Sequence, residues 1–168
     1  MDLLELIAAR KSIRKYKPDS IEPEKLEKVA EAFRLSPSAK NLQGWQLICV
    51  ENPELKEKIR DASTGRAPML GQAPAILVAV GFSRRVMTCG HRSATVDLSI
   101  AMSYACLEAY TLGLGTCWMA SYSEEAVKAA LGLPDEASVV AISPIGYADE
   151  APSPKPRKPL AEVFKIIT

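Results

Sequence analysis

Near the middle of the chain, the run APAILVAVGF (residues 73–82) contains no charged side chain and no alternation of polar and apolar residues. A short continuous run rich in Val, Ile, Leu and Ala is typical of a strand that is buried on both faces of its sheet. Such a strand is stable only when other layers of the fold cover both faces. The run therefore predicts a central strand with helices on both sides.

Helical and extended patterns surround this run. Apolar residues recur at helical spacing, with capping residues at several starts and glycine at several ends. The predicted helices cover residues 3–10, begin near Pro23 and after Asn52, extend over residues 94–112, and run from Ser123 to Gly132. Further strands are predicted at residues 45–51 and 138–146, and TCWMAS (residues 116–121) reads as a strand or the end of one. The length and patterning predict one domain over residues 1–168.

Charge and hydropathy argue against two classes of protein. Lys plus Arg number 21 and Asp plus Glu number 20, so the formal net charge is +1. A nearly neutral chain disfavours a nucleic-acid-binding or membrane-surface protein. The most apolar segment, residues 96–114, carries Asp97 and Glu108 inside it and is expected to be a buried helix instead of a membrane span.

The 4 cysteines form no CxxC pair and show no other metal-ligand spacing. Each has apolar or small neighbours, so buried thiols in a reducing cytoplasm are favoured over a metal site or disulfides. The start of the chain, MDLLELIAARKS, lacks the long apolar core and the cleavage site of a secretory signal. We therefore expect a cytoplasmic protein without a metal centre.

Positive charge gathers in two clusters at opposite ends of the chain, RKSIRKYK (residues 10–17) and KPRK (residues 155–158). If the first helix ends near Lys11, then Arg10 and Arg14 can lie close together with the Ser12 hydroxyl between them. Two guanidinium groups and a hydroxyl are well suited to a terminal phosphate. Arg157, held by flanking prolines, could close the same site. Solvated surface charge is an equal alternative for these residues taken alone.

The segment SPSAKNLQGWQ (residues 36–46) places many hydrogen-bonding side chains and a tryptophan between a predicted helix and a predicted strand. A loop built in this way is typical of a binding site. The chain has no GxGxxG or GxxxxGKS/T pattern, so a dinucleotide cradle or a phosphoryl-transfer loop is not supported. The only histidine, His91, lies in a polar stretch, where an exposed or capping role is favoured over that of a catalytic base.

Three stretches that together cover nearly the whole chain resemble the nitroreductase family of FMN-dependent oxidoreductases. ARKSIRKYKPDSIEPEKLEKVAEAFRLSPSAKNLQGWQLICV (residues 9–50) is similar to the family's amino-terminal signature. LGLGTCWMAS (residues 112–121), which follows an apolar helix, is similar to its flavin-proximal segment. SPIGYADEAPSPKPRKPLAEV (residues 143–163) is similar to its closing strand and basic tail.

The resemblance implies a fold and an assembly. The fold would be α+β, a three-layer α/β/α sandwich with a mixed, mainly antiparallel sheet, assembled as a domain-swapped homodimer with FMN at the subunit interface. Residues 147–168 would form an extended tail that packs on the partner subunit. The apolar helix over residues 94–112 would be the central element of the dimer.

The resemblance also implies site residues. The FMN phosphate and the pyrimidine side of the flavin would be held by Arg10, Lys11, Ser12 and Arg14, with Lys155 and Arg157 completing the phosphate site. The neighbouring subunit would contribute its copies of Pro37, Ser38, Ala39 and Asn41. The backbone near the reactive N5 edge corresponds to Ala120 and Ser121, and the strand end along the ring system corresponds to Pro144, Ile145 and Gly146. Arg14 would stabilise the anionic reduced flavin by its charge, and no acid–base side chain is required.

The activity implied by the resemblance is a ping-pong transfer of hydride from NADH or NADPH to FMN and then of electrons to a nitroaromatic, quinone or related small-molecule acceptor. Alternatives are a flavin carrier or sensor without efficient turnover, a specialised flavin reductase such as a dehalogenase, and a structural or interaction domain with incidental basic patches. Gly44 stands where the family commonly has proline, which predicts a more mobile loop. The short connection after Phe82 predicts an open site with little cover.

Overall fold

The computed structural model of the chain describes residues 2–168 and contains one sheet with its strands in the order β1-β2-β4-β3. The strands are β1 (Trp45–Val50), β2 (Ala75–Gly81), β3 (Gly115–Thr116) and β4 (Ser138–Gly146). Each neighbouring pair is antiparallel, with a register shift in the β2–β4 pair between Ala79 and Val80. The predicted central strand is confirmed, because β2 lies inside the sheet and all of its residues are buried.

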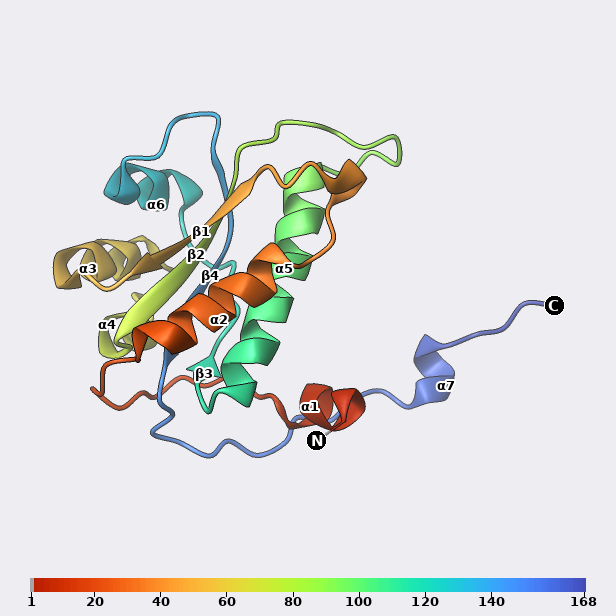
Figure 1. Cartoon of the computed structure of the whole chain (residues 1–168), viewed down its shortest axis with the longest axis horizontal. Coiled ribbons are helices and arrows are strands. Elements are labelled where there is room, and N and C mark those ends of the chain that lie inside the picture. The colour runs from red at the N-terminus through yellow and green to blue at the C-terminus, as the bar shows by residue number, and fades with distance from the viewer. Residues whose placement is uncertain (1) are drawn as a thin grey trace.

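Helices cover both faces of this sheet (Figure 1). One layer consists of α2 (Pro23–Arg34) and α5 (Ser93–Thr111), and the other of α3 (Pro53–Ala62), α4 (Pro68–Gln72) and α6 (Glu124–Leu131). Side chains of β2 alternate between the two layers. Leu77 and Ala79 pack in the core under α2 and α5, whereas Ile76, Val78 and Val80 pack in the core under α3, α4 and α6. The α+β, three-layer α/β/α architecture is therefore confirmed, and a parallel bridge between Ser12 and Thr116 accompanies the antiparallel strands.

Several helices begin and end where their capping residues predict. The first helix, α1 (Leu3–Ala9), starts with a capping box in which the Asp2 carboxylate accepts a hydrogen bond from the Glu5 backbone N–H at 2.8 Å. The Ser123 hydroxyl accepts a hydrogen bond from the Ala126 N–H at the start of α6. That helix ends at Gly132, whose φ of 63° lies in the left-handed region that favours glycine.

Short elements and the cysteines differ from the sequence-based predictions. The 3-10 turn η1 (Ala39–Asn41) and helix α4 were not predicted, because elements of this length carry too little periodicity. In TCWMAS only Thr116 belongs to a strand, and Met119 makes an isolated bridge with Ile142. The prediction of four buried thiols is wrong for Cys49 and Cys89, which are exposed, and these two lie on edge strand β1 and on the polar loop before α5.

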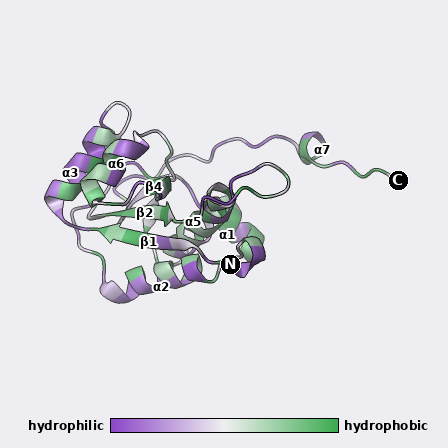
Figure 2. Ribbon diagram, turned by 90° about the horizontal axis from the view of Figure 1, so that it is seen from above, coloured by the Kyte–Doolittle hydropathy of each residue, from purple (hydrophilic) through white to green (hydrophobic). Residues whose placement is uncertain are grey.

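After β4 the chain forms an extended tail. It contains one short helix, α7 (Leu160–Val163), which projects away from the three layers in two perpendicular views (Figures 1 and 2). Its apolar side chains are in contact with solvent, since Leu160 is 73% exposed and Ile167 is 85% exposed. Among residues 2–168, no helix is sufficiently long and apolar to span a membrane.

Close packing at the end of β4 leads to a prediction about two glycines. A Cβ atom at Gly146 would lie 2.5 Å from Cδ of Pro74, whose ring cannot rotate away. Gly146→Ala should therefore lower the free energy of unfolding by about 1–3 kcal/mol through overpacking. The matched control is Gly44→Ala, because a Cβ there would lie 3.6 Å from the nearest atom, on Ser83. Urea denaturation measures both changes, and equal losses of stability would contradict this account of the packing.

Candidate functional site

The two basic clusters, which lie at opposite ends of the sequence, meet in one hollow of about 450 Å³. Residues from the start of the chain line one part of it, and residues from the tail line the rest. The polar and charged lining residues are Arg10, Lys11, Ser12, Arg14, Ser153, Lys155 and Arg157. All six residues assigned by resemblance to the phosphate end of the cofactor site therefore lie around the same space.

Backbone hydrogen bonds bring these clusters together. The N–H of Ile13 donates to the carbonyl of Thr116 at 2.9 Å, which attaches the first cluster to the end of β3. The N–H of Lys17 donates to Tyr147 O and the N–H of Asp149 donates to Lys15 O, each at 2.9 Å. The start of the tail therefore runs antiparallel to the first cluster and directs the KPRK segment toward it.

The charge in this hollow is strongly one-sided. In the part of the chain that the structure describes, none of the five cationic side chains that line it forms an ion pair. The Glu150 carboxylate is nearby, but it accepts a hydrogen bond from the backbone N–H of Arg14 at 2.5 Å. Converging Arg and Lys side chains with a serine hydroxyl have the donor chemistry of a phosphate site. The residues present therefore fit a phosphate-bearing cofactor such as FMN.

A second hollow of about 390 Å³ shares Arg10 and Ser12 with the first and extends along α5. Its other lining residues include Cys106, Leu107 and the indole of Trp118, which is 39% exposed. Sequence reasoning did not select Trp118, although a tryptophan beside the predicted flavin-proximal positions is a usable signal. The hollow gives a flat ligand an apolar wall next to the basic cluster.

Beyond Trp118, the chain reaches the two residues predicted to lie near the reactive edge of the flavin. Ala120 and Ser121 are exposed. The carbonyl of Ser121 accepts a hydrogen bond from the N–H of Thr64 at 2.9 Å, and Ser63 forms an isolated bridge with Tyr122. The turn between α3 and α4 therefore lies beside Ser121, a neighbour that sequence reasoning also missed because the contact joins distant segments.

The predicted binding loop lies elsewhere on the same chain. The N–H of Ala39 donates to the carboxylate of Asp97 at 3.0 Å, which ties the loop to the first turns of α5 (Figure 1). On that helix, Ser103 and Cys106 line the second hollow, about 9 Å and 13 Å farther along the axis, and no residue of the loop lines either hollow. Within one chain, the structure thus does not bring the predicted loop residues to the basic hollow. These residues are Pro37, Ser38, Ala39 and Asn41.

Another predicted group is buried. Pro144, Ile145 and Gly146 lie at the end of β4 with no exposed surface of note. The Pro74 ring packs against Gly146, and the buried Tyr16 ring lies next to it. These three residues therefore support the sheet and do not line either hollow.

Neither a metal site nor a catalytic histidine is seen in the part of the chain that the structure describes. Across residues 2–168, no three His, Cys, Asp or Glu side chains gather as a metal site would require. His91 is exposed on the loop before α5, where its carbonyl accepts a hydrogen bond from the N–H of Met87. It lies in neither of the hollows described above.

Comparisons with known proteins find relatives along most of the chain. The sequence model described as the nitroreductase family matches residues 7–67 and 60–147. The chain is 31% identical over 188 residues to the NADH dehydrogenase of Thermus thermophilus, with 92% of this chain and 90% of that protein covered.

Two solved structures show the same fold. A nitroreductase family protein from Clostridium novyi NT has a TM-score of 0.84 and 34% identity, covering 89% of this chain and 87% of that one. The FMN-dependent nitroreductase of Clostridium difficile R20291 has a TM-score of 0.81 and 31% identity, covering 92% of each chain. The family match spans most of the sequence, and these relatives share its fold and close to a third of its residues. The chain therefore belongs to the nitroreductase family.

Proposed function

We propose that this protein is an FMN-dependent NAD(P)H oxidoreductase. The observation that carries the proposal is the convergence of two distant basic clusters and the Ser12 hydroxyl on one hollow, with an apolar wall beside it. That arrangement matches a cofactor with a phosphate at one end and a flat ring system at the other. The relatives named as an FMN-dependent nitroreductase and an NADH dehydrogenase support the same assignment.

When bound, FMN supplies the redox centre that takes a hydride from NADH or NADPH and then reduces a nitroaromatic, quinone or related acceptor in a ping-pong cycle. The chain's own residues would bind and orient the cofactor. Arg10, Lys11, Lys155 and Arg157 would neutralise the phosphate, and the Ser12 hydroxyl would donate to it. Arg14 would supply positive charge to stabilise the reduced cofactor. The backbone at Ala120 and Ser121 would border the reacting part of the cofactor.

We propose further that the active form is a homodimer. No residue of the loop 36–46 lines the basic hollow or the second hollow of its own chain, so its copy in a second subunit would complete the site. The apolar tail residues would pack on that subunit, because a monomer leaves Phe164 60% exposed and Ile166 71% exposed. Residues 147–168 are thus part of the single domain and a dimer contact.

The visible absorption spectrum tests the central proposal. The purified protein, given FMN and then desalted, should retain the flavin absorption band, and NADH or NADPH added without oxygen should bleach it. Addition of an acceptor such as menadione should restore the band. Retained flavin that neither nucleotide bleaches would contradict the oxidoreductase assignment and favour a carrier. Failure to retain any flavin would contradict the cofactor assignment itself.

Removal of one phosphate ligand should weaken cofactor binding. Arg157→Ala should raise the FMN dissociation constant about ten- to a hundredfold, since a hydrogen bond to a charged group contributes roughly 1.5–3 kcal/mol. The control is Arg34→Ala on α2, where the guanidinium is paired with Glu31 at 2.6 Å. Quenching of FMN fluorescence during titration gives both constants. Equal affinity in the two variants would show that the KPRK segment is only solvated charge.

The apolar tail should control assembly. Replacement of Phe164 and Ile166 by serine should shift the protein toward monomer, because both side chains lose the apolar surface that would be buried on the partner. Lys165→Ser, between them, should leave assembly unchanged. Sedimentation velocity over a range of protein concentrations measures the outcome. A wild-type protein that stays monomeric at high concentration would disprove the proposed dimer.

A further inference from the structure

The backbone carries strain at a place to which no function has been assigned. Among residues 2–168, the non-glycine residues with positive φ are Lys40, Asn41, Gln43 and Arg66. An L residue in this region costs conformational free energy, and such residues are enriched at functional sites. The first three lie in the loop expected to hold the flavin. Arg66, with a φ of 49°, lies instead in the turn Ser63–Ala67 between α3 and α4.

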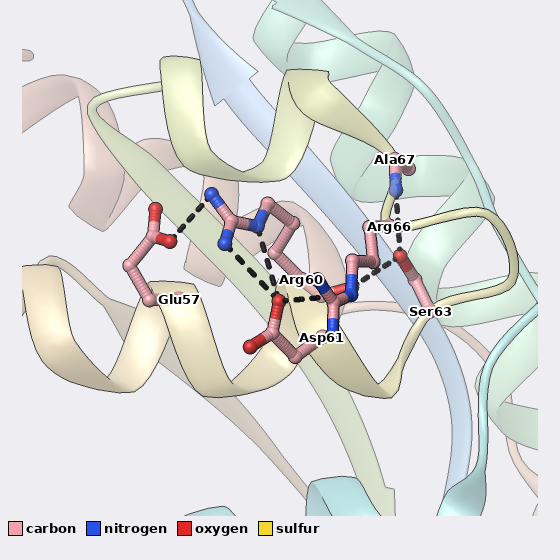
Figure 3. A network of polar contacts seen from close by, with 6 residues as sticks. All are labelled: Glu57, Arg60, Asp61, Ser63, Arg66 and Ala67. Carbon is pink, nitrogen blue, oxygen red and sulfur yellow. Dashed lines mark hydrogen bonds and ion pairs between the residues drawn. The ribbon is translucent and has the colours of Figure 1, made fainter.

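This turn is rigidly held (Figure 3). The Ser63 hydroxyl donates to the carbonyl of Arg60 at 2.6 Å and accepts a hydrogen bond from the N–H of Ala67 at 2.9 Å. The N–H of Arg66 donates to the carbonyl of Ser63 at 3.1 Å. These bonds hold Arg66 in its unfavourable conformation.

The same turn is attached to the proposed reacting edge. Thr64 lies two residues before Arg66 in the chain. Its N–H donates to the carbonyl of Ser121 at 2.9 Å. Ala120 and Ser121, which border that edge, are exposed to solvent. A substrate seated against this edge therefore lies next to the turn that carries Arg66.

The guanidinium of Arg66 is only loosely engaged (Figure 3). Its side chain is 75% exposed, and its Nε lies 3.7 Å from Oδ1 of Asp61. That same oxygen accepts closer hydrogen bonds from Arg60, at 3.1 Å from Nη2 and 3.3 Å from Nε. Because Arg60 makes the closer contacts with the Asp61 carboxylate, most N–H donors of the Arg66 guanidinium remain available to bind another anion.

We propose that Arg66 is a specificity-determining residue that binds an anionic group, a carboxylate or a phosphate, on a substrate reacting beside Ala120 and Ser121. The inference rests on the proposed function and names the class of substrate that the site prefers. Two sources share this chemistry: an acidic electron acceptor, and the phosphate that distinguishes NADPH from NADH. A purely structural Arg66, tied to Asp61, would stabilise the turn and leave substrate choice unaffected.

The test compares values of kcat/KM for matched pairs of substrates with the full-length protein loaded with FMN. The first pair is 4-nitrobenzoate and the neutral 4-nitrobenzamide, reduced with NADH. The second pair is NADPH and NADH, with neutral menadione as acceptor. The variant is Arg66→Asn, because asparagine tolerates positive φ and has no charge. The opposite variant is Asp61→Asn, which frees Arg66 from its carboxylate neighbour, and Arg34→Asn is the control.

In one of the two substrate pairs, Arg66→Asn should lower the preference for the anionic member about two- to fivefold, in line with a solvent-exposed ion pair. Asp61→Asn should raise the same preference, and the control should leave it unchanged. A shift confined to the nitrobenzoate pair identifies an acidic acceptor, and a shift confined to the nucleotide pair identifies the NADPH phosphate. Arg66→Gly, which removes the backbone strain, should maintain or raise the melting temperature while losing the same preference.

Three results would overturn the inference, each in a different way. If the wild-type protein oxidises NAD(P)H but Arg66→Asn changes neither preference, Arg66 does not select substrates, and the proposed function still stands. If the wild-type protein holds no FMN, both proposals fail together. A lower melting temperature for Arg66→Gly with unchanged preferences would show instead that the contact with Asp61 is structural.

Discussion

Burial of β2 on both faces is the constraint on which the rest of this structure depends. Its larger side chains, Ile76, Leu77, Val78 and Val80, are almost completely buried, and each contributes roughly 1.5–3 kcal/mol relative to an exposed position. Only two helical layers can bury both faces at once. At the end of the strand, a Cβ on Gly81 would lie 2.9 Å from side chains of Ala94 and Leu98, so α5 approaches the sheet very closely there. The position of α5 in turn sets where both halves of the proposed site can lie.

The basic hollow depends on a different part of the fold, the backbone contacts at the edge of the sheet. The segment after α1 is fixed by the hydrogen bond from Ile13 to Thr116 and by the buried Tyr16, whose hydroxyl donates to Ile13 O at 2.6 Å. The pairing of Tyr16 with Ala148 then directs the tail back over the same segment. Because five cations gather there without paired carboxylates, the arrangement is stabilised when an anion binds. A phosphate-bearing cofactor would thus stabilise the contact between the two ends of the chain.

Backbone strain lies at two of the places where the proposed site meets its substrates. Three of the non-glycine residues with positive φ are in the loop tied to Asp97, and the fourth is Arg66, in the turn whose Thr64 N–H donates to Ser121. The connection between β2 and α5 covers residues 82–92, and none of these residues lines the basic hollow or the hollow along α5. Under the proposed function, the turn between α3 and α4 contacts a substrate held beside Ser121 and discriminates between charged and neutral ones.

Local signals in the sequence were enough to predict the layered architecture, the helix caps at Ser123 and Gly132, and the residues of the basic hollow. These features follow from hydrophobic period, capping chemistry and a motif carried by neighbouring residues. Which strand lies at an edge, and hence that Cys49 is exposed, depends on pairing between distant segments, as does the burial of Pro144–Gly146. The same holds for the neighbours of Ser121, because Thr64 and Ser121 meet only through the packing of α3 and α4 against the sheet. The sequence by itself determined what the elements are and which groups can bind phosphate, whereas tertiary packing alone decided which of those groups share a surface.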